Sequence, residues 1–174
     1  MDVLIDLARK EDINIVYLPL LNQRESLWGM YVPKRPGNKA TIYMDSQLKE
    51  NPNLYRLARC VLSEELGHHF TGVFSYFSCY KVYPYSLKRK MSADDKKALQ
   101  WATNMLVPTA ELISLITEDG ICECVDLAGY FGVTAWFMYR KMEFLQYQVR
   151  AKRPEICLAL NWGLVSQVKI SCIY

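Results

Sequence analysis

The sequence predicts an α+β fold that is mostly helical, with a small antiparallel sheet in its N-terminal part. Of the 174 residues, 51% are hydrophobic and 22% are charged, a balance typical of a globular chain with a sizeable core. Several long segments place apolar residues at three- and four-residue spacing, which indicates amphipathic helices. Short β-branched runs precede them, and these indicate strands.

The N-terminal part contains the predicted sheet. Residues 2–10 have the pattern of a short amphipathic helix. Three runs are typical of strands: 13–18, 28–32 and 40–44. The loop 33–38 between the last two contains two prolines, a glycine and an asparagine, so these two runs should form a β-hairpin. Together with the first strand, the hairpin gives the small antiparallel sheet.

The rest of the chain should be helical. A long helix is predicted over 52–70, beginning at Pro52, and a second one from Ser92 to just before Pro108. The aromatic-rich segment 71–91 between them has no clear period and is interpreted as a loop or broken helix. Helices on either side of a turn at Gly132, from 125 to 147, resemble a helix-turn-helix. We expect three regions: a core of residues 1–118, a helical helix-turn-helix-like segment of 119–150 packed on it, and a tail of 151–174.

Charge and hydropathy favour a cytoplasmic protein. The net charge of +3 is too small to indicate nucleic-acid binding. No segment approaches the roughly 18 apolar residues that a membrane span needs. The N-terminus carries Asp2 and Asp6 where a secretory signal would be basic. The six cysteines form no C-x-x-C pair, so we expect reduced thiols and a cytoplasmic location.

The segment Glu64-Glu65-Leu-Gly-His68 has the spacing of the zinc-peptidase motif H-E-x-x-H, with its first ligand changed to Glu. Residues four apart share one helical face, and Glu64 and His68 continue the apolar stripe of Leu57 and Val61. Both are therefore expected to face the core, as two metal ligands. Glu65 is rotated by about 100°, which places it to accept a proton from the water that a metal activates. Glu65 is the predicted catalytic general base.

The overlapping register from Glu65 to His69 also has a spacing of four, but it places Leu66 at the base position and is rejected. His69 is instead a candidate for substrate or transition-state contact, and so are Tyr76 and Tyr80.

A third metal ligand is expected on the next helix, where Asp94 and Asp95 are the candidates. A structural alternative exists, because Ser92-x-x-Asp95 also resembles a capping box at a helix N-terminus.

Three segments carry a resemblance to a known family. Residues 60–72 (CVLSEELGHHFTG) are similar to the pattern LA(H/E)ELGHxxTG, and residues 95–108 are similar to ExxAxxFAxxLLxP. Residues 127–134, followed by Arg140 and Leu145, are similar to the helical segment that comes next. Over about residues 1–147 the chain resembles the ImmA/IrrE family of metallopeptidases, which prophages and integrative elements often encode.

The resemblance implies a zincin-like catalytic core in residues 1–118 and a metallo-endopeptidase. It implies Glu64, His68 and Asp95 as the metal ligands, with Asp95 at a position where the family usually has Glu. Zinc is the expected divalent metal, and manganese is the alternative because two of the three ligands are carboxylates. The implied reaction is the cleavage of a helix-turn-helix repressor of a mobile element by metal-activated water.

Two other functions are open. Segment 125–147 would serve a DNA-binding transcriptional regulator, although Trp136 and Phe137 occupy the turns that should meet base edges. Direct nucleic-acid binding is therefore not expected. The other alternative is a catalytically inactive protein that binds the repressor without cutting it.

Overall fold

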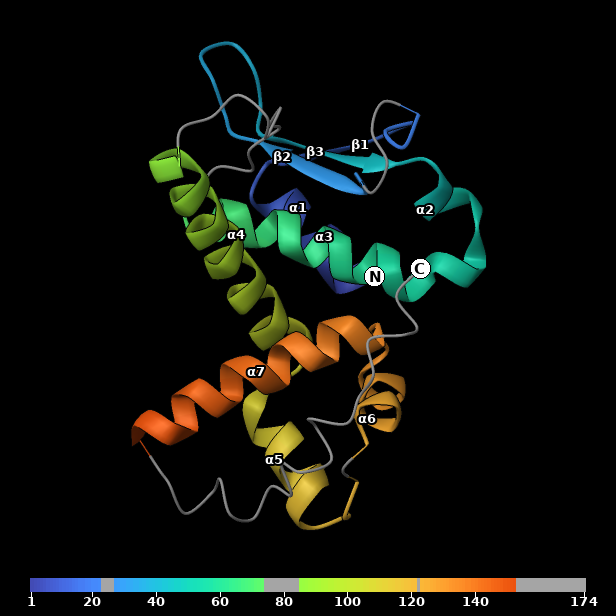
Figure 1. Cartoon of the computed structure of the whole chain (residues 1–174). Coiled ribbons are helices and arrows are strands. Elements are labelled where there is room, and N and C mark those ends of the chain that lie inside the picture. The colour runs from blue at the N-terminus through green and yellow to red at the C-terminus, as the bar shows by residue number, and fades with distance from the viewer. Residues whose placement is uncertain (23–26, 74–84, 122, 153–174) are drawn as a thin grey trace. The chain divides into compact units, whose positions relative to one another are not determined.

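The computed structural model describes residues 1–22, 27–73, 85–121 and 123–152 (Figure 1). The chain forms two compact units, Met1–Ala102 and Thr103–Tyr174, which are described separately. The predicted α+β class with mostly helical content is confirmed. Tyr76, Tyr80 and the tail after residue 152 lie outside the described residues. None of the helices in the described ranges has the length and apolar content needed to cross a membrane.

The first unit contains the predicted helix, three strands and the long helix. Its elements are α1 (Asp2–Lys10), β1 (Asn14–Leu18), β2 (Gly29–Val32), β3 (Thr41–Asp45), α2 (Gln47–Glu50), the 3₁₀ turn η1 (Pro52–Leu54), α3 (Tyr55–Phe70) and most of α4 (Tyr85–Leu106). Asn51 caps η1 by accepting a hydrogen bond from the amide of Asn53 at 3.0 Å, and Pro52 occupies the first turn. The start of the long helix predicted at Pro52 is confirmed.

The sheet is mixed, so the prediction of an antiparallel sheet is wrong in one pairing. β2 and β3 form the expected antiparallel hairpin, but β1 pairs with β3 in parallel, and the order is β1-β3-β2. The chain reverses direction after β1 and again after β2, so β1 and β3 run the same way. They pair in parallel because β3, with its fully buried Ile42 and Met44, takes the central position between the other two strands.

The sheet lies over α1 and α3 (Figure 1). Leu62 and Leu66 are fully buried on α3, and Leu4 and Ala8 are buried on α1. Full burial of a leucine side chain contributes about 1.5–3 kcal/mol. The apolar faces of the two helices and the underside of the sheet therefore form the core of the first unit.

Helix α4 begins at Tyr85, so the predicted start at Ser92 is wrong. The aromatic-rich segment 71–91 has no regular apolar period, so its sequence contains no indication that a helix begins at Tyr85. Because α4 begins at Tyr85, Asp94 and Asp95 lie in its interior. The capping-box interpretation of Ser92 and Asp95 therefore does not hold.

Helices α3 and α4 pack against each other with backbone contact at Gly67. A Cβ on Gly67 would lie 2.3 Å from the carbonyl oxygen of Ala98. One turn before Gly67, the hydroxyl of Ser63 donates to the carbonyl oxygen of Ala102 at 3.3 Å. Ala102 lies one turn after Ala98. Moving back along α3 therefore means moving forward along α4, so the two helices run antiparallel. A glycine in the middle of a helix costs about 1 kcal/mol in propensity, and here close helix packing explains its presence.

We expect Gly67→Ala to destabilise the protein by about 1–3 kcal/mol, because the new methyl group meets backbone rather than a movable side chain. Gly129→Ala is the matched control. Gly129 is also helical, and a Cβ there would meet nothing within 4 Å. That variant should gain up to about 1 kcal/mol from helix propensity. Urea denaturation measures both. Equal effects of the two substitutions would contradict the close packing.

The second unit contains the end of α4 and α5 (Thr109–Thr117), α6 (Cys124–Phe131) and α7 (Ala135–Lys152). Gly132, with φ of 61°, forms the turn between α6 and α7, and Thr134 caps α7 by accepting from the amide of Phe137 at 3.2 Å. The two predicted helices and their turn are confirmed, whereas α5 was not predicted. A DNA-binding role for this segment stays a prediction.

The ammonium group of Lys141 is buried in the second unit. The residue is 2% exposed, and Nζ donates to Asn104 Oδ1 and Thr109 Oγ1, both at 2.7 Å. Both acceptors are neutral, so no carboxylate among these contacts compensates the charge. Burial therefore lowers the pKa of Lys141 from 10.5 to about 8.

We expect the stability of the protein to rise between pH 8 and 10.5 because of Lys141. Over this range the folded state releases the proton while the unfolded state keeps it, so the unfolded state binds more protons and stability increases with pH. The shift corresponds to at most about 3 kcal/mol. Denaturant titrations of wild type and Lys141→Met across this range measure it. The same pH dependence in both proteins would contradict the assignment to Lys141.

Candidate metal centre

Strand β2 contacts one side of helix α3, and helix α4 contacts another. The predicted ligands Glu64 and His68 lie on the part of the α3 surface between these two sides. On one side, a Cβ on Gly29 of β2 would lie 3.0 Å from Glu65 Oε1, so β2 passes directly over this position. On the other side, Gly67 contacts α4. Because each residue advances about 100° around a helix, Glu64 and His68 lie between these two sides.

Burial on α3 differs from the prediction in one respect. His68 is 3% exposed, as expected for a residue facing inward, but Glu64 is only half-buried. Glu65, at the predicted base position, is the buried carboxylate, with 7% exposure. Glu64 is therefore less buried than the core-facing position predicted for it, and its role as a metal ligand stays a prediction. Glu65 is the more buried of the two because β2 covers the side of α3 that carries it.

Strand β2 runs alongside α3 in matched steps. Gly29 lies over Glu65, and two residues later Tyr31 contacts His69, which is four residues further along the helix. Two strand residues span about 6.6–6.8 Å and four helical residues span about 6.0 Å, so the two elements stay in register over this distance. The glycine at position 29 allows the strand to approach the Glu65 side chain.

His69 ties three elements together. Its Nδ1 shares a hydrogen bond with the Tyr31 hydroxyl at 2.9 Å, and its Nε2 lies 3.4 Å from Glu11 Oε2, just after α1. Burial raises the pKa of Tyr31, which is 6% exposed and therefore remains a neutral phenol. Sequence reasoning missed Tyr31 and Glu11, since they are 38 and 58 residues away from His69 and no local motif includes them.

The structure brings His68 and Asp95 together. His68 Nε2 lies 3.8 Å from Asp95 Oδ1. The neighbouring Asp94 is buried, with 6% exposure, whereas the Asp95 side chain is 41% exposed. Asp95 thus contacts the imidazole, and the charge of the neighbouring Asp94 also acts on this ring.

The His68–Asp95 contact is not an ion pair, although its distance falls within salt-bridge range. Burial lowers the pKa of His68 to about 4, against opposing effects from the Val73 backbone and Asp94. Burial and then the charge of Asp94 raise the pKa of Asp95 to about 6. Above pH 6 the imidazole is neutral, and below pH 4 the carboxyl is protonated. The two groups are therefore not charged together, and burial outweighs their attraction.

The donor atoms fit a metal ion in part. Metal ligands must be deprotonated, and His68 is neutral at pH 7, with no hydrogen-bond partner for its buried Nδ1 within the described ranges. Two ligand atoms on one tetrahedral zinc lie roughly 3.3–3.6 Å apart, close to the 3.8 Å between His68 and Asp95. Within the described ranges, however, no three His, Cys, Asp or Glu side chains are grouped to hold a metal. Glu64 as third ligand stays a prediction.

Comparisons with protein-family models, with curated proteins and with solved structures gave no match. The resemblance to the ImmA/IrrE family, the zincin-like core and the site that they imply therefore stay predictions.

We expect the His68 imidazole of the metal-free protein to titrate near pH 4, because burial penalises its charged form. The chain has only two histidines, so an NMR titration of wild type and His69→Gln assigns both rings. A midpoint for His68 at or above 6.5, the ordinary value, would contradict the burial of this ring.

Proposed function

We propose that the chain is a metal-dependent endopeptidase that cleaves a helix-turn-helix repressor of a mobile genetic element. One observation carries the proposal. A buried glutamate, Glu65, lies on α3 three residues before a neutral imidazole, His68, which meets the carboxylate of Asp95. A proton acceptor beside a neutral nitrogen and a carboxylate oxygen is the set of groups that metal-assisted hydrolysis requires.

His68 and Asp95 would hold the metal together with Glu64. The ion, when bound, acts as a Lewis acid that polarises a carbonyl and makes water more acidic. Zinc is the expected ion, and manganese is the alternative because two carboxylates make the ligand set richer in oxygen. His68 can bind without first losing a proton at pH 7, since its pKa lies near 4.

Glu65 would act as the general base and then as the general acid. Its carboxylate would take a proton from the attacking water and deliver it to the amine that leaves. The contact between Gly29 and the Glu65 side chain holds the carboxylate under β2. The hydrogen bond between Tyr31 and His69 fixes the position of β2, and β2 in turn limits the conformations open to Glu65.

The repressor as substrate rests on the family resemblance of residues 60–72 and 95–108. The inactive repressor-binding alternative has the same partner but no cleavage. A variant that removes only the proton acceptor therefore separates the two.

We expect co-expression with the repressor encoded beside the chain to give cleavage with wild type and none with Glu65→Gln, because an amide cannot accept the proton from water. The fall in rate should be at least about 100-fold. Immunoblotting of the repressor measures cleavage. Glu118→Gln, a change of the same chemistry at an exposed position after α5, is the matched control and should cleave normally.

Metal analysis of the purified variants completes this experiment. Glu65→Gln should retain one divalent ion per chain, whereas His68→Gln and Asp95→Asn should lose it. Reconstituting metal-stripped wild type with zinc or manganese identifies the ion. If Glu65→Gln and wild type leave the repressor equally intact or equally cut, the peptidase proposal fails.

A further inference from the structure

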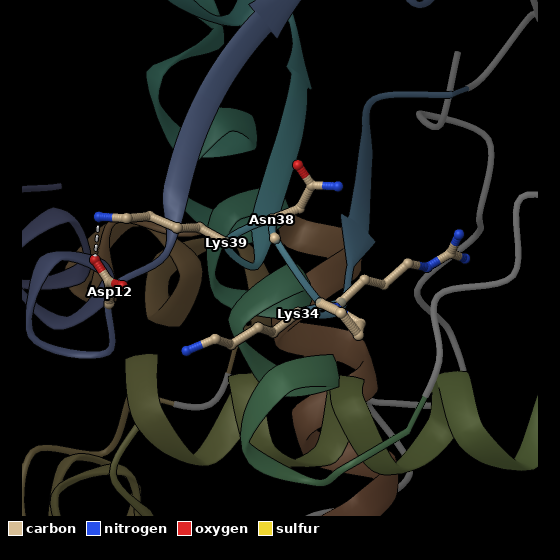
Figure 2. A pocket seen from close by; sticks show the side chains of 7 residues that line it. Asp12, Lys34, Asn38 and Lys39 are labelled. Atoms are coloured by element: carbon tan, nitrogen blue, oxygen red, sulfur yellow. Dashed lines mark hydrogen bonds and ion pairs between the residues drawn. The ribbon is translucent and has the colours of Figure 1, made fainter.

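The residues that line an open depression at the tip of the β2–β3 hairpin include three with positive side chains (Figure 2). Lys34, Arg35 and Lys39 are all exposed there, and Asp12 lies at the side of the depression. We call Lys34, Arg35 and Lys39 the basic hairpin tip. It belongs entirely to the first unit of the chain, as do the predicted metal ligands.

One of the three charges is compensated and two are not. Lys39 Nζ donates to Asp12 Oδ1 at 2.6 Å, drawn as the dashed line in Figure 2. This hydrogen bond, together with the charges of Lys39 and Lys34, lowers the pKa of Asp12. Lys34 and Arg35 form no ion pair with the residues that the structure describes. The basic hairpin tip therefore carries an excess of about two positive charges, held in water.

The backbone of the tip is ordered by its own hydrogen bonds. The amide of Asn38 donates to the carbonyl of Arg35 at 2.9 Å, and the amide of Arg35 donates back at 3.3 Å. Gly37 adopts φ of 82°, which other residues rarely do, and so closes the turn. The bases of the lysine and arginine side chains are therefore fixed in position before any partner arrives, which reduces the entropy lost on binding.

The tip is a direct continuation of the strand that passes over the candidate metal centre. β2 starts at Gly29 against Glu65, passes Tyr31 at His69, and leads into the tip at Lys34. Five residues span at most about 17 Å when fully extended. A polypeptide that lies along this side of the first unit with a peptide bond near Glu65 would reach the tip about five residues away.

The small size of the cluster favours an acidic protein segment over nucleic acid. Binding along a phosphate backbone draws its affinity from several Lys and Arg side chains that each neutralise a phosphate. The basic hairpin tip offers three cations, and Asp12 lies among them. Glu11 precedes Asp12 and adds a second negative charge nearby. Separate carboxylates on a flexible peptide can avoid Asp12 and Glu11, whereas a continuous phosphate backbone cannot.

We propose that the basic hairpin tip binds acidic side chains of the protein substrate, about five residues from the bond that is cut. The assignment of this partner as a substrate rests on the proposed function, but binding itself needs no cleavage. The tip would thus select substrates that carry a cluster of Asp or Glu at this distance from the site.

The test measures binding of a fluorescein-labelled alanine-rich peptide that carries four glutamates, by fluorescence anisotropy, to the full chain with Glu65→Gln. A peptide with glutamines in place of the glutamates is the reference. The acidic peptide should bind more tightly, and added salt should weaken it. Lys34→Gln with Arg35→Gln should weaken binding by about tenfold, the loss expected for two exposed charge contacts.

Two further variants make the test specific. Lys49→Gln with Arg56→Gln removes the same charge from exposed positions of the same unit, on α2 and α3, and should leave binding within about twofold. Asp12→Asn should tighten binding by about two- to fourfold, because it removes the negative charge from the tip. If only the net charge of the protein mattered, the two double variants would weaken binding equally, because each removes two positive charges.

Three results would overturn the proposal: no preference for the acidic peptide over its glutamine counterpart, equal weakening by the two double variants, or a DNA duplex that binds more tightly than the peptide through Lys34 and Arg35. The last would make the tip a phosphate-binding surface. Failure of this test leaves repressor cleavage untouched. Conversely, a chain that binds the peptide through the tip but cuts no repressor refutes only the peptidase proposal.

Discussion

The backbone contact between α3 and α4 at Gly67 determines which side chains can meet at the candidate metal centre. With the Gly67 backbone against the Ala98 carbonyl, the antiparallel register of the two helices is fixed. One residue after Gly67 is His68, and three residues before Ala98 is Asp95, so these two fall opposite each other at 3.8 Å. A side chain at position 67 would meet the Ala98 backbone, so the two helices would have to shift and the 3.8 Å approach of His68 to Asp95 would change with them. The glycine is thus a requirement of the helix packing that brings these two residues together.

The same packing creates the electrostatic character of the site. Burial lowers the pKa of His68 and raises that of Asp95, so it disfavours the charged form of each group. Neither shift is reversed by the contact between the two groups, since the imidazole stays neutral wherever the carboxylate is charged. Asp95 is 41% exposed and lies beside a neutral nitrogen rather than beside a cation, so the His68–Asp95 contact does not compensate its charge. This uncompensated carboxylate beside a neutral imidazole is the physical argument behind the proposed metal dependence.

The local part of this arrangement could be predicted from the sequence, and the long-range part could not. The turn residues of 33–38 predict the hairpin, and the spacing of apolar residues predicts α3 with Glu64, Glu65 and His68 on it. The parallel pairing of β1 with β3 depends on which strand is covered on both edges, and no local pattern encodes this. Likewise, the apolar stripe of α3 predicts its buried face correctly only if a single neighbouring element covers the helix. Here β2 and α4 cover two sides, so Glu65 rather than Glu64 became the buried carboxylate. The early start of α4 was missed because its first turns have no apolar period.

The two adjacent histidines illustrate how the fold resolves an ambiguity in the sequence. Glu64 to His68 and Glu65 to His69 have the same spacing, and only the lack of a base at Leu66 favoured the first register. The structure adds an independent reason. His69 is rotated by about 100° from His68 and uses both ring nitrogens on Tyr31 and Glu11, so it holds β2 and the end of α1 against α3. His68 faces α4 instead, with Asp95 beyond its Nε2. His69 therefore positions β2, the strand that covers Glu65 and continues into the basic hairpin tip. His68 keeps its Nε2 directed at Asp95, as the proposed nitrogen ligand requires.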